Sequence, residues 1–193
     1  MVTALGKRIG LLGGSFNPAH EGHLYISQVA IAELGLDAVW WLVAPKNPLK
    51  EKTSLASFKE RLTGAKEMTA GNPIEVLDLE QTEGLFYTID TVHFLPENFP
   101  DYSFVWLMGA DCFLELPAWK SWQEIMAEIP IAVFPRPGFT KNALSGIAAT
   151  TFQKNRLKGT EAKNLVVTKP AAWVYIDCKE NPISATKIRE GRS

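Results

Sequence analysis

Hydrophobic residues along this chain fall into short unbroken runs and longer periodic segments, which alternate from the amino terminus onward. Short apolar runs bounded by glycine or proline are typical of strands buried on both faces of a sheet. We expect strands of this kind at 8–14, 38–44, 104–111, 131–135 and 173–177, and a strand with an alternating pattern at 74–80. Segments with a helical period lie between them, and we expect helices at 21–34, 55–70, 88–95, 142–157 and, at the end, in ISATKIR (183–189).

Strands separated by helical segments predict right-handed crossover connections between neighbouring parallel strands. The expected fold class is therefore α/β, with a doubly wound, mostly parallel sheet and helices on both faces. No internal repeat, low-complexity segment or linker interrupts the pattern, so we expect one domain over residues 1–193.

Composition leaves the expected fold unchanged and argues against several kinds of partner and location. Hydrophobic residues make up 46% of the chain, charged residues 21%, and the formal net charge is −1. These values give no reason to expect a nucleic-acid or membrane partner, so any anion must bind at a local site. Cys112 and Cys178, the only cysteines, lack metal-ligand spacing, and no apolar run is long enough for a signal peptide or a membrane span. We expect a cytoplasmic protein.

The stretch GGSFNPAHEGHL (13–24) carries the first candidate chemistry, directly after the first predicted strand. Gly13 and Gly14 have no Cβ and let the backbone approach a ligand closely. The helix that follows presents unpaired N–H groups and the positive end of its dipole, which favour phosphate. His20 and His23, three residues apart at the helix start, are expected on neighbouring sides of one face, where both can donate to phosphate oxygens. The pattern predicts a triphosphate site.

Two other phosphate motifs are excluded here. No Gly-Lys-Ser/Thr ending follows the glycines, and Pro18 occupies the third glycine position of the dinucleotide fingerprint. Taken alone, the H-x-x-H spacing is equally well explained by two surface histidines after a glycine turn, or by a pair of metal ligands. The strand–loop–helix context favours the nucleotide.

With these residues in place, the stretch resembles the G-x-F-x-P-x-H-x-G-H signature of nucleotidyltransferases that carry the H-x-G-H motif. The matching residues are Gly14, Phe16, Pro18, His20, Gly22 and His23. The resemblance implies a Rossmann-like fold and transfer of a nucleotidyl group from a triphosphate, with release of pyrophosphate. It also implies ATP contacts from these residues: Gly13, Gly14, Ser15, Phe16, Gly22 and His23.

A second signature lies at the other end of the chain. ISATKIR (183–189) resembles the I-S-S-T-x-I-R motif of the same enzymes, with Ala185 in place of the second serine. Ser184 is expected to cap the last helix, although capping alone would also explain it. The resemblance places Ile183, Ser184, Thr186 and Arg189 at the ATP phosphates, where the planar guanidinium is a strong donor.

Segments in the middle of the chain resemble the bacterial nicotinate mononucleotide adenylyltransferases. VAPKNPLK (43–50) is similar to the loop after the second strand of that family, which assigns Lys46 and Lys50 to the mononucleotide phosphate; Leu49 replaces a family histidine. FYTIDT (86–91) is similar to the Y-T-x-x-T segment. It implies mononucleotide contacts from Tyr87 and Thr88, with the Thr88 main-chain N–H at the pyridine carboxylate. Thr88 is also a candidate N-cap.

The stretch MGADCFLELPAWKSW (108–122) resembles the G-x-D segment of the family and the tryptophan that follows it. The resemblance puts Gly109 and Asp111 at the adenosine, and Trp119 against the pyridine ring, where cation–π attraction adds to stacking. Taken alone, Trp119 is equally a core residue. Arg136 matches a loop near the adenine.

The resemblance implies that nicotinate mononucleotide attacks ATP, that His20, His23 and Arg189 carry catalysis, and that Mg²⁺ arrives with ATP rather than in a protein cage. Other acceptors, such as nicotinamide mononucleotide or phosphopantetheine, stay open, as does a nucleotide-binding module without turnover. A redox dinucleotide-binding protein is disfavoured because the G-x-G-x-x-G pattern is missing.

Overall fold

The computed structural model describes residues 6–45 and 55–191, and within them the chain forms a seven-stranded sheet in the order β3-β2-β1-β4-β5-β7-β6. Every strand pairing in this sheet is parallel. The strands are β1 (Arg8–Gly14), β2 (Ala38–Val43), β3 (Ile74–Leu77), β4 (Ser103–Gly109), β5 (Ile131–Phe134), β6 (Arg156–Leu157) and β7 (Trp173–Tyr175). The expected α/β class is confirmed, and the sheet is wholly rather than mostly parallel.

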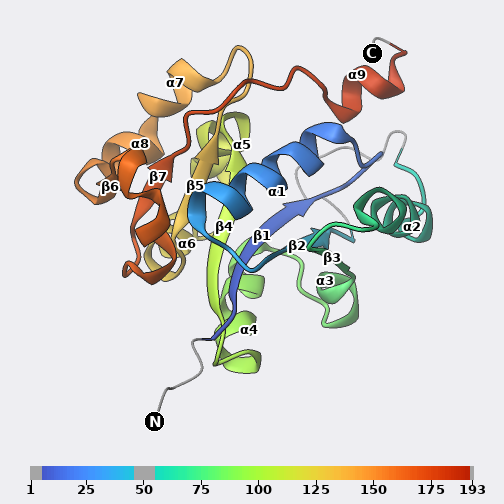
Figure 1. The fold of residues 1–193 in the computed structure, drawn as a ribbon, viewed down its shortest axis with the longest axis horizontal. Coiled ribbons are helices and arrows are strands. Elements are labelled where there is room, and N and C mark those ends of the chain that lie inside the picture. Colours follow the sequence, from blue (N-terminus) through green and yellow to red (C-terminus); the bar gives the residue numbers. More distant parts are fainter. Residues whose placement is uncertain (1–5, 46–54, 192–193) are drawn as a thin grey trace.

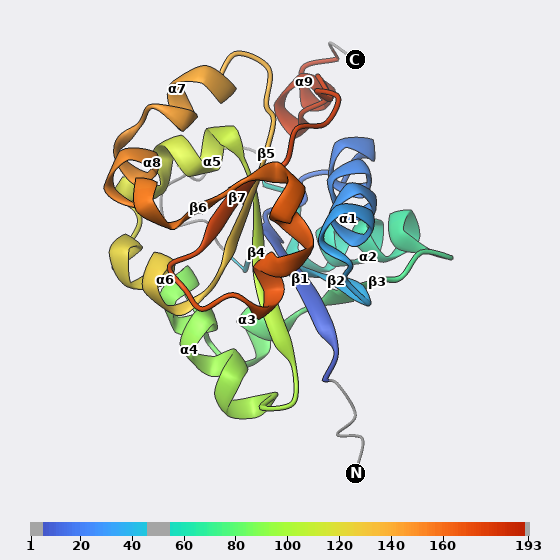
Figure 2. The same ribbon diagram turned by 60° about the vertical axis from the view of Figure 1, so that its left-hand side comes forward.

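Helices cover both faces of the sheet, as the pattern predicts (Figures 1 and 2). One face is covered by α1 (Glu21–Leu34), α2 (Phe58–Thr69) and the 3₁₀ segment η3 (Gly159–Val167). The other is covered by α4 (Thr88–Asn98), α5 (Ala110–Glu115), η1 (Leu116–Ala118), α6 (Trp122–Glu128), α7 (Thr140–Leu144) and α8 (Ile147–Thr151). The short elements α3 (Leu79–Thr82), η2 (Gln153–Asn155) and α9 (Ala185–Arg189) complete the chain.

Alternate residues of the central strands supply the two halves of the core. Ile9 and Leu11 of β1 pack with α4–α6, whereas Leu12 packs with α1 and η3 on the opposite face. This alternation is the consequence of the two-residue period of a strand, and it explains why strands buried on both faces are continuously apolar in sequence.

Several expected boundaries are wrong, and local chemistry explains the differences. The strand expected at 74–80 ends at Leu77, after which α3 turns the carboxyl of Glu80 into the core at 8% exposure. The helix expected at 55–70 begins only at Phe58 because Ser57 forms a capping box with Glu60. The helix expected at 21–34 has these bounds in the structure, with Gly35 as its C-cap at a φ of 63°.

The helix expected at 142–157 does not exist as one element. An extended backbone at Gly146 separates α7 from α8, and the chain then forms η2 and the edge strand β6, which pairs with β7. The polar composition of this region concealed η3, whose Ala162, Leu165 and Val166 are buried. Cys112 and Cys178 are free thiols, and both are half-buried.

Candidate active site

The predicted site residues gather at the carboxyl ends of the central strands. β1 pairs with β2 on one side and with β4 on the other, so the order of strands reverses between β1 and β4. A reversal of this kind opens a crevice beyond the strand ends, where ligands bind in open α/β sheets. Gly13 and Gly14 end β1, and Gly109 ends β4, on the two sides of this crevice.

His20 and His23 lie against each other at the start of α1, with ring centroids 3.8 Å apart. His20 is the N-cap of α1 and not its first turn, which corrects the expectation that both rings project from one helical face. The Nδ1 atom of His20 accepts a hydrogen bond from the Gly22 N–H at 3.1 Å, and that of His23 accepts from the His20 N–H at 3.2 Å. Each ring therefore satisfies a main-chain donor that the helix leaves unpaired.

These two bonds also fix where the imidazole protons are. Burial, with Arg136 nearby, lowers the pKa of His20 to about 4. Burial, then the charges of His20 and Arg136, lower the pKa of His23 to about 3. Both rings are therefore neutral near pH 7, and because Nδ1 accepts, the single proton of each ring is on Nε2. The pair can therefore donate two Nε2–H hydrogen bonds, but neither ring is an imidazolium that could act as a general acid.

Close packing holds this arrangement. A Cβ on Gly22 would lie 2.9 Å from the His20 Nδ1, so only glycine admits the ring over the helix start. The Phe16 ring contacts the His23 ring at a centroid distance of 4.8 Å and stacks on Trp41, also at 4.8 Å. Phe16 is 1% exposed, and its ring supports His23 from behind.

Arg136, after β5, connects the middle of the chain to both of its ends. Its Nη1 donates to the Ile183 carbonyl at 2.9 Å, and its Nε lies 3.5 Å from the Asp111 carboxylate. Its charge also lowers the pKa of His20 and His23, as described above. Arg136 thus joins the loops after β4, β5 and β7 around the histidine pair.

Arg189 brings the second signature to the same place. From α9 its guanidinium donates to the Asn17 carbonyl at 2.5 Å and to the Thr186 hydroxyl at 3.3 Å. Ser184 is the N-cap of α9, as expected, and its hydroxyl accepts from the Lys187 N–H. Segments more than 160 residues apart therefore meet at one crevice, with α9 beside the start of α1 (Figure 1).

Of the residues assigned to the mononucleotide, Tyr87, Thr88 and Trp119 lie close together, on the sheet face that α4 and η1 cover. Tyr87, not Thr88, precedes α4, because the Asp90 carboxylate accepts the Tyr87 N–H at 3.1 Å. Thr88 is the first residue of α4, so its N–H has no partner within the helix. Trp119 is half-buried, and the adjacent Lys120 ammonium lies 4.3 Å from the centre of the Tyr87 ring. Lys46 and Lys50 lie outside the described residues.

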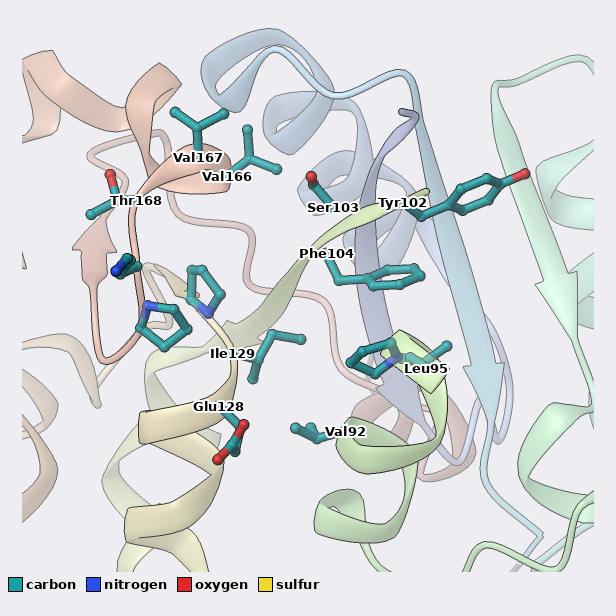
Figure 3. Close-up of a pocket in the computed structure, with 14 residues that line it drawn as sticks. Val92, Leu95, Tyr102, Ser103, Phe104, Glu128, Ile129, Val166, Val167 and Thr168 are labelled. Atoms are coloured by element: carbon teal, nitrogen blue, oxygen red, sulfur yellow. The ribbon is translucent and has the colours of Figure 1, made fainter. Parts of the chain in front are cut away.

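A cavity of about 440 Å³ lies at the opposite edge of the sheet, where strands begin (Figure 3). It is lined mainly by residues of α4, the start of β4, the end of η3 and the segment that follows it, among them Leu95, Phe104 and Val166. The carboxyl ends of the strands, with the histidine pair, are far from this edge. The cavity is therefore not part of the candidate active site.

Within residues 6–45 and 55–191, no group of three or more His, Cys, Asp or Glu forms a candidate metal site. The site offers imidazole, amide and guanidinium donors, whereas Mg²⁺ takes oxygen ligands. None of the described helices is long and apolar enough to span a membrane.

Comparison with known proteins places this geometry in a family. The model of the family described as cytidylyltransferase-like matches residues 11–191. The probable nicotinate-nucleotide adenylyltransferase of Parvibaculum lavamentivorans is 48% identical over 96% of this chain and 92% of its own. That of Gluconobacter oxydans is 45% identical over 95% and 94%. The chain belongs to the nicotinate-nucleotide adenylyltransferases of the cytidylyltransferase-like family.

Solved structures agree on the architecture of this adenylyltransferase family. The Plasmodium falciparum nicotinic acid mononucleotide adenylyltransferase, complexed with NaAD, superposes with a TM-score of 0.70 over 95% of this chain and 83% of that one. The two sequences are 19% identical, so the likeness shows the fold alone. The Rossmann-like architecture and the family that the motifs predict are both confirmed.

Two residues of this site were missed in the sequence. Asn17 accepts the Ala56 N–H through its side chain and Arg189 through its carbonyl. Arg61 is 3% exposed and donates to carbonyls of the loops after β1 and β2. The available signal was its helical spacing from Ala65, which placed a charged residue on the buried stripe of α2.

Proposed function

We propose that this protein transfers the adenylyl group of ATP to the 5′-phosphate of nicotinate mononucleotide, with deamido-NAD and pyrophosphate as products. One observation carries the proposal: two neutral imidazoles, each held as an Nε2–H donor, lie together at the start of α1, beyond the carboxyl end of β1. Membership of the adenylyltransferase family supports the same reaction.

The chemistry needs no general base. A 5′-phosphate oxygen is already anionic near neutral pH, so it attacks the α-phosphorus of ATP directly. The bond to the α–β bridging oxygen breaks, and its electron pair leaves with pyrophosphate. Alignment and charge stabilisation then account for catalysis.

Different residues of the site provide the alignment and the charge stabilisation. The Nε2–H groups of His20 and His23 donate to the α-phosphate and to the departing pyrophosphate, because each Nδ1 is occupied by a main-chain N–H. Arg189 and the start of α9, with Ser184 and Thr186, hold the β- and γ-phosphates. Ser15, Gly109, Asp111 and Arg136 line the ATP side of the crevice. Preorganised donors of this kind cost no reorganisation when charge develops.

Mg²⁺ enters this scheme with the nucleotide. Apart from the Asp111 carboxylate, the groups of the site are donors that suit phosphate oxygens, so the ion would be held mostly by the triphosphate and by water. When bound, it neutralises part of the triphosphate charge.

The positive charge around the start of α4 favours the acid, nicotinate mononucleotide, over the amide as the acceptor. Thr88 opens α4, an 11-residue helix whose amino end is electropositive. Lys120 adds a positive charge over Tyr87, beside that helix end, although Asp90 at 3.9 Å offsets part of it. A pyridine carboxylate is attracted to this environment, whereas a neutral carboxamide gains less from it. Trp119 provides a flat face for the ring.

A competition assay tests the proposal. Nicotinate mononucleotide and nicotinamide mononucleotide are offered together with ATP, and both dinucleotide products are quantified alongside released pyrophosphate. We expect the acid dinucleotide to dominate. Preference for the amide overturns the acceptor assignment, and binding of ATP without product from any phosphate acceptor overturns transfer itself.

A further inference from the structure

Arg61 is a buried cation inside the amino-terminal half of the protein. It lies one turn into α2 and is only 3% exposed. The capping box between Ser57 and Glu60 fixes the start of this helix, with Ser57 N–H to Glu60 Oε2 at 2.8 Å. The direction of the Arg61 side chain is set by that start, since helix side chains project at fixed angles from their turn.

The guanidinium of Arg61 bonds three separate stretches of backbone. Its Nη1 donates to the Ser15 carbonyl at 2.6 Å and to the Ala44 carbonyl at 2.9 Å. Its Nη2 donates to the Pro45 carbonyl at 3.1 Å, and its Nε to the Ala56 carbonyl at 3.2 Å. A planar fork with five N–H donors can span several acceptors at once, which a lysine ammonium cannot do with the same geometry.

Two of these stretches are the ends of neighbouring strands. Ser15 follows β1 and Ala44 follows β2, and the strand ladder continues to this point through the Ala44 N–H, which donates to the Gly14 carbonyl at 2.9 Å. Beyond Ala44, where the pairing of β1 with β2 stops, the Arg61 guanidinium bonds the backbone segments that follow both strands.

The turn after β1 is held from its other end as well. Arg189 donates to the Asn17 carbonyl, so two guanidinium groups hold Ser15 and Asn17 on either side of Phe16. Phe16 has a φ of 46°, a conformation that a side-chain-bearing residue keeps only when its surroundings enforce it. Its ring in turn supports His23.

We propose that Arg61 is a positioning residue that sets the separation between the ATP-binding turn after β1 and the chain that leaves β2. This inference rests on the proposed function, in which the first segment serves ATP and the sequence resemblance assigns the second to the mononucleotide. A fixed separation aligns the attacking phosphate with the α-phosphorus. Loss of the clamp should therefore reduce turnover more than the binding of either substrate alone.

Three substitutions test the clamp. Arg61→Lys keeps the charge but not the fork, Arg61→Ala removes both, and Lys59→Met removes an exposed positive charge from the same helix as a matched control. For each protein, kcat is measured with nicotinate mononucleotide and ATP, the Kd of a non-hydrolysable ATP analogue by calorimetry, and Tm by thermal unfolding. Arg61→Ala is also assayed with added guanidinium chloride, well below its denaturing range.

We expect kcat to fall about 10- to 100-fold in Arg61→Lys and further in Arg61→Ala, as misplacement of reacting groups predicts. The Kd of the ATP analogue should change by no more than about threefold, a small fraction of the 100-fold that misplacement can cost in turnover. Free guanidinium should restore part of the lost kcat in Arg61→Ala, and Lys59→Met should match the wild type.

Other outcomes overturn the inference. It fails if kcat of Arg61→Lys stays near that of the wild type, or if the lost activity is matched by a lost fraction of folded protein or of analogue-binding sites. Should Arg61→Ala not fold, Arg61→Lys alone decides. Failure of the proposed function is distinguishable, because the wild-type protein itself would then form no acid dinucleotide.

Discussion

His23 accepts the main-chain N–H of His20 through Nδ1, at 3.2 Å, while the two rings lie 3.8 Å apart between centroids. The bond makes the second histidine of the motif a capping residue for the first. It explains why the spacing is three residues, since a side chain at the third helical position reaches back to the N-cap N–H.

The protonation state of this pair can be observed directly. The chain has three histidines, so each gives a separate set of imidazole signals in nitrogen-detected NMR. Because burial lowers the pKa of His20 to about 4 and that of His23 to about 3, both should show a protonated Nε2 and an unprotonated Nδ1 at pH 7. A His93→Gln variant identifies the third signal. Titration of His20 or His23 near pH 6.5 would contradict the assignment.

Removal of either imidazole should abolish most turnover. We expect His20→Asn and His23→Ala each to lower kcat by about 100- to 1,000-fold, the cost of one preorganised donor. Asn is chosen at position 20 because it can still cap α1, whereas alanine would cost about 1 kcal/mol of stability. Steady-state kinetics and thermal unfolding separate the two effects. His93→Ala, on exposed α4 surface, should keep wild-type kcat; an equal loss there would count against a specific role.

A single methyl group at Gly22 should act through His20. In Gly22→Ala the new Cβ would lie 2.9 Å from Nδ1 of His20, so the ring must move and the cap is weakened. We expect kcat to fall about 10- to 100-fold, in line with the cost of misplacing a catalytic group. The matched control is Gly64→Ala, within α2, where nothing lies within 4 Å of the new methyl. That change should leave kcat alone and raise the free energy of unfolding by about 0.5–1 kcal/mol.

Sequence patterns predicted the part of the fold that local chemistry decides. β1 and α1 begin and end at the expected residues, because the strand is apolar up to its glycines and the helix ends at Gly35 in the left-handed conformation. The region after β5 was predicted wrongly, because its helical period arises from two short helices, α7 and α8, and not from one long helix. There the edge strand β6 forms only because β7, which begins 16 residues after β6 ends, offers a free edge.

Residues of the candidate site that belong to a motif could be predicted from the sequence. Residues whose role depends on tertiary contacts could not. The motifs brought His20, His23 and Arg189 together correctly. The prediction misplaced the cap of α4, since Asp90 gives that position to Tyr87. Arg61 was missed because its partners are main-chain carbonyls, which leave no trace in side-chain composition.

Glu80 provides the clearest pH dependence of stability. Its carboxyl is 8% exposed, accepts the Thr91 hydroxyl at 3.0 Å, and has a pKa that burial raises from 4.5 to about 7. The folded state therefore binds more protons than the unfolded state between these values, and stability falls as pH rises through about 7. The total loss should approach about 3 kcal/mol.

Glu80→Gln should remove this dependence, because the amide keeps the oxygen that Thr91 donates to but cannot ionise. Denaturant unfolding of both proteins between about pH 4.5 and pH 8 measures the difference between their slopes, which should lie mainly below pH 7. His20 and His23, whose lowered pKa values cost stability as pH falls below 6.5, contribute equally to both proteins and cancel in the difference. Glu83→Gln, an exposed carboxyl three residues away, should keep the wild-type slope. Parallel slopes in wild type and Glu80→Gln would show that the Glu80 carboxyl is not held protonated by its burial.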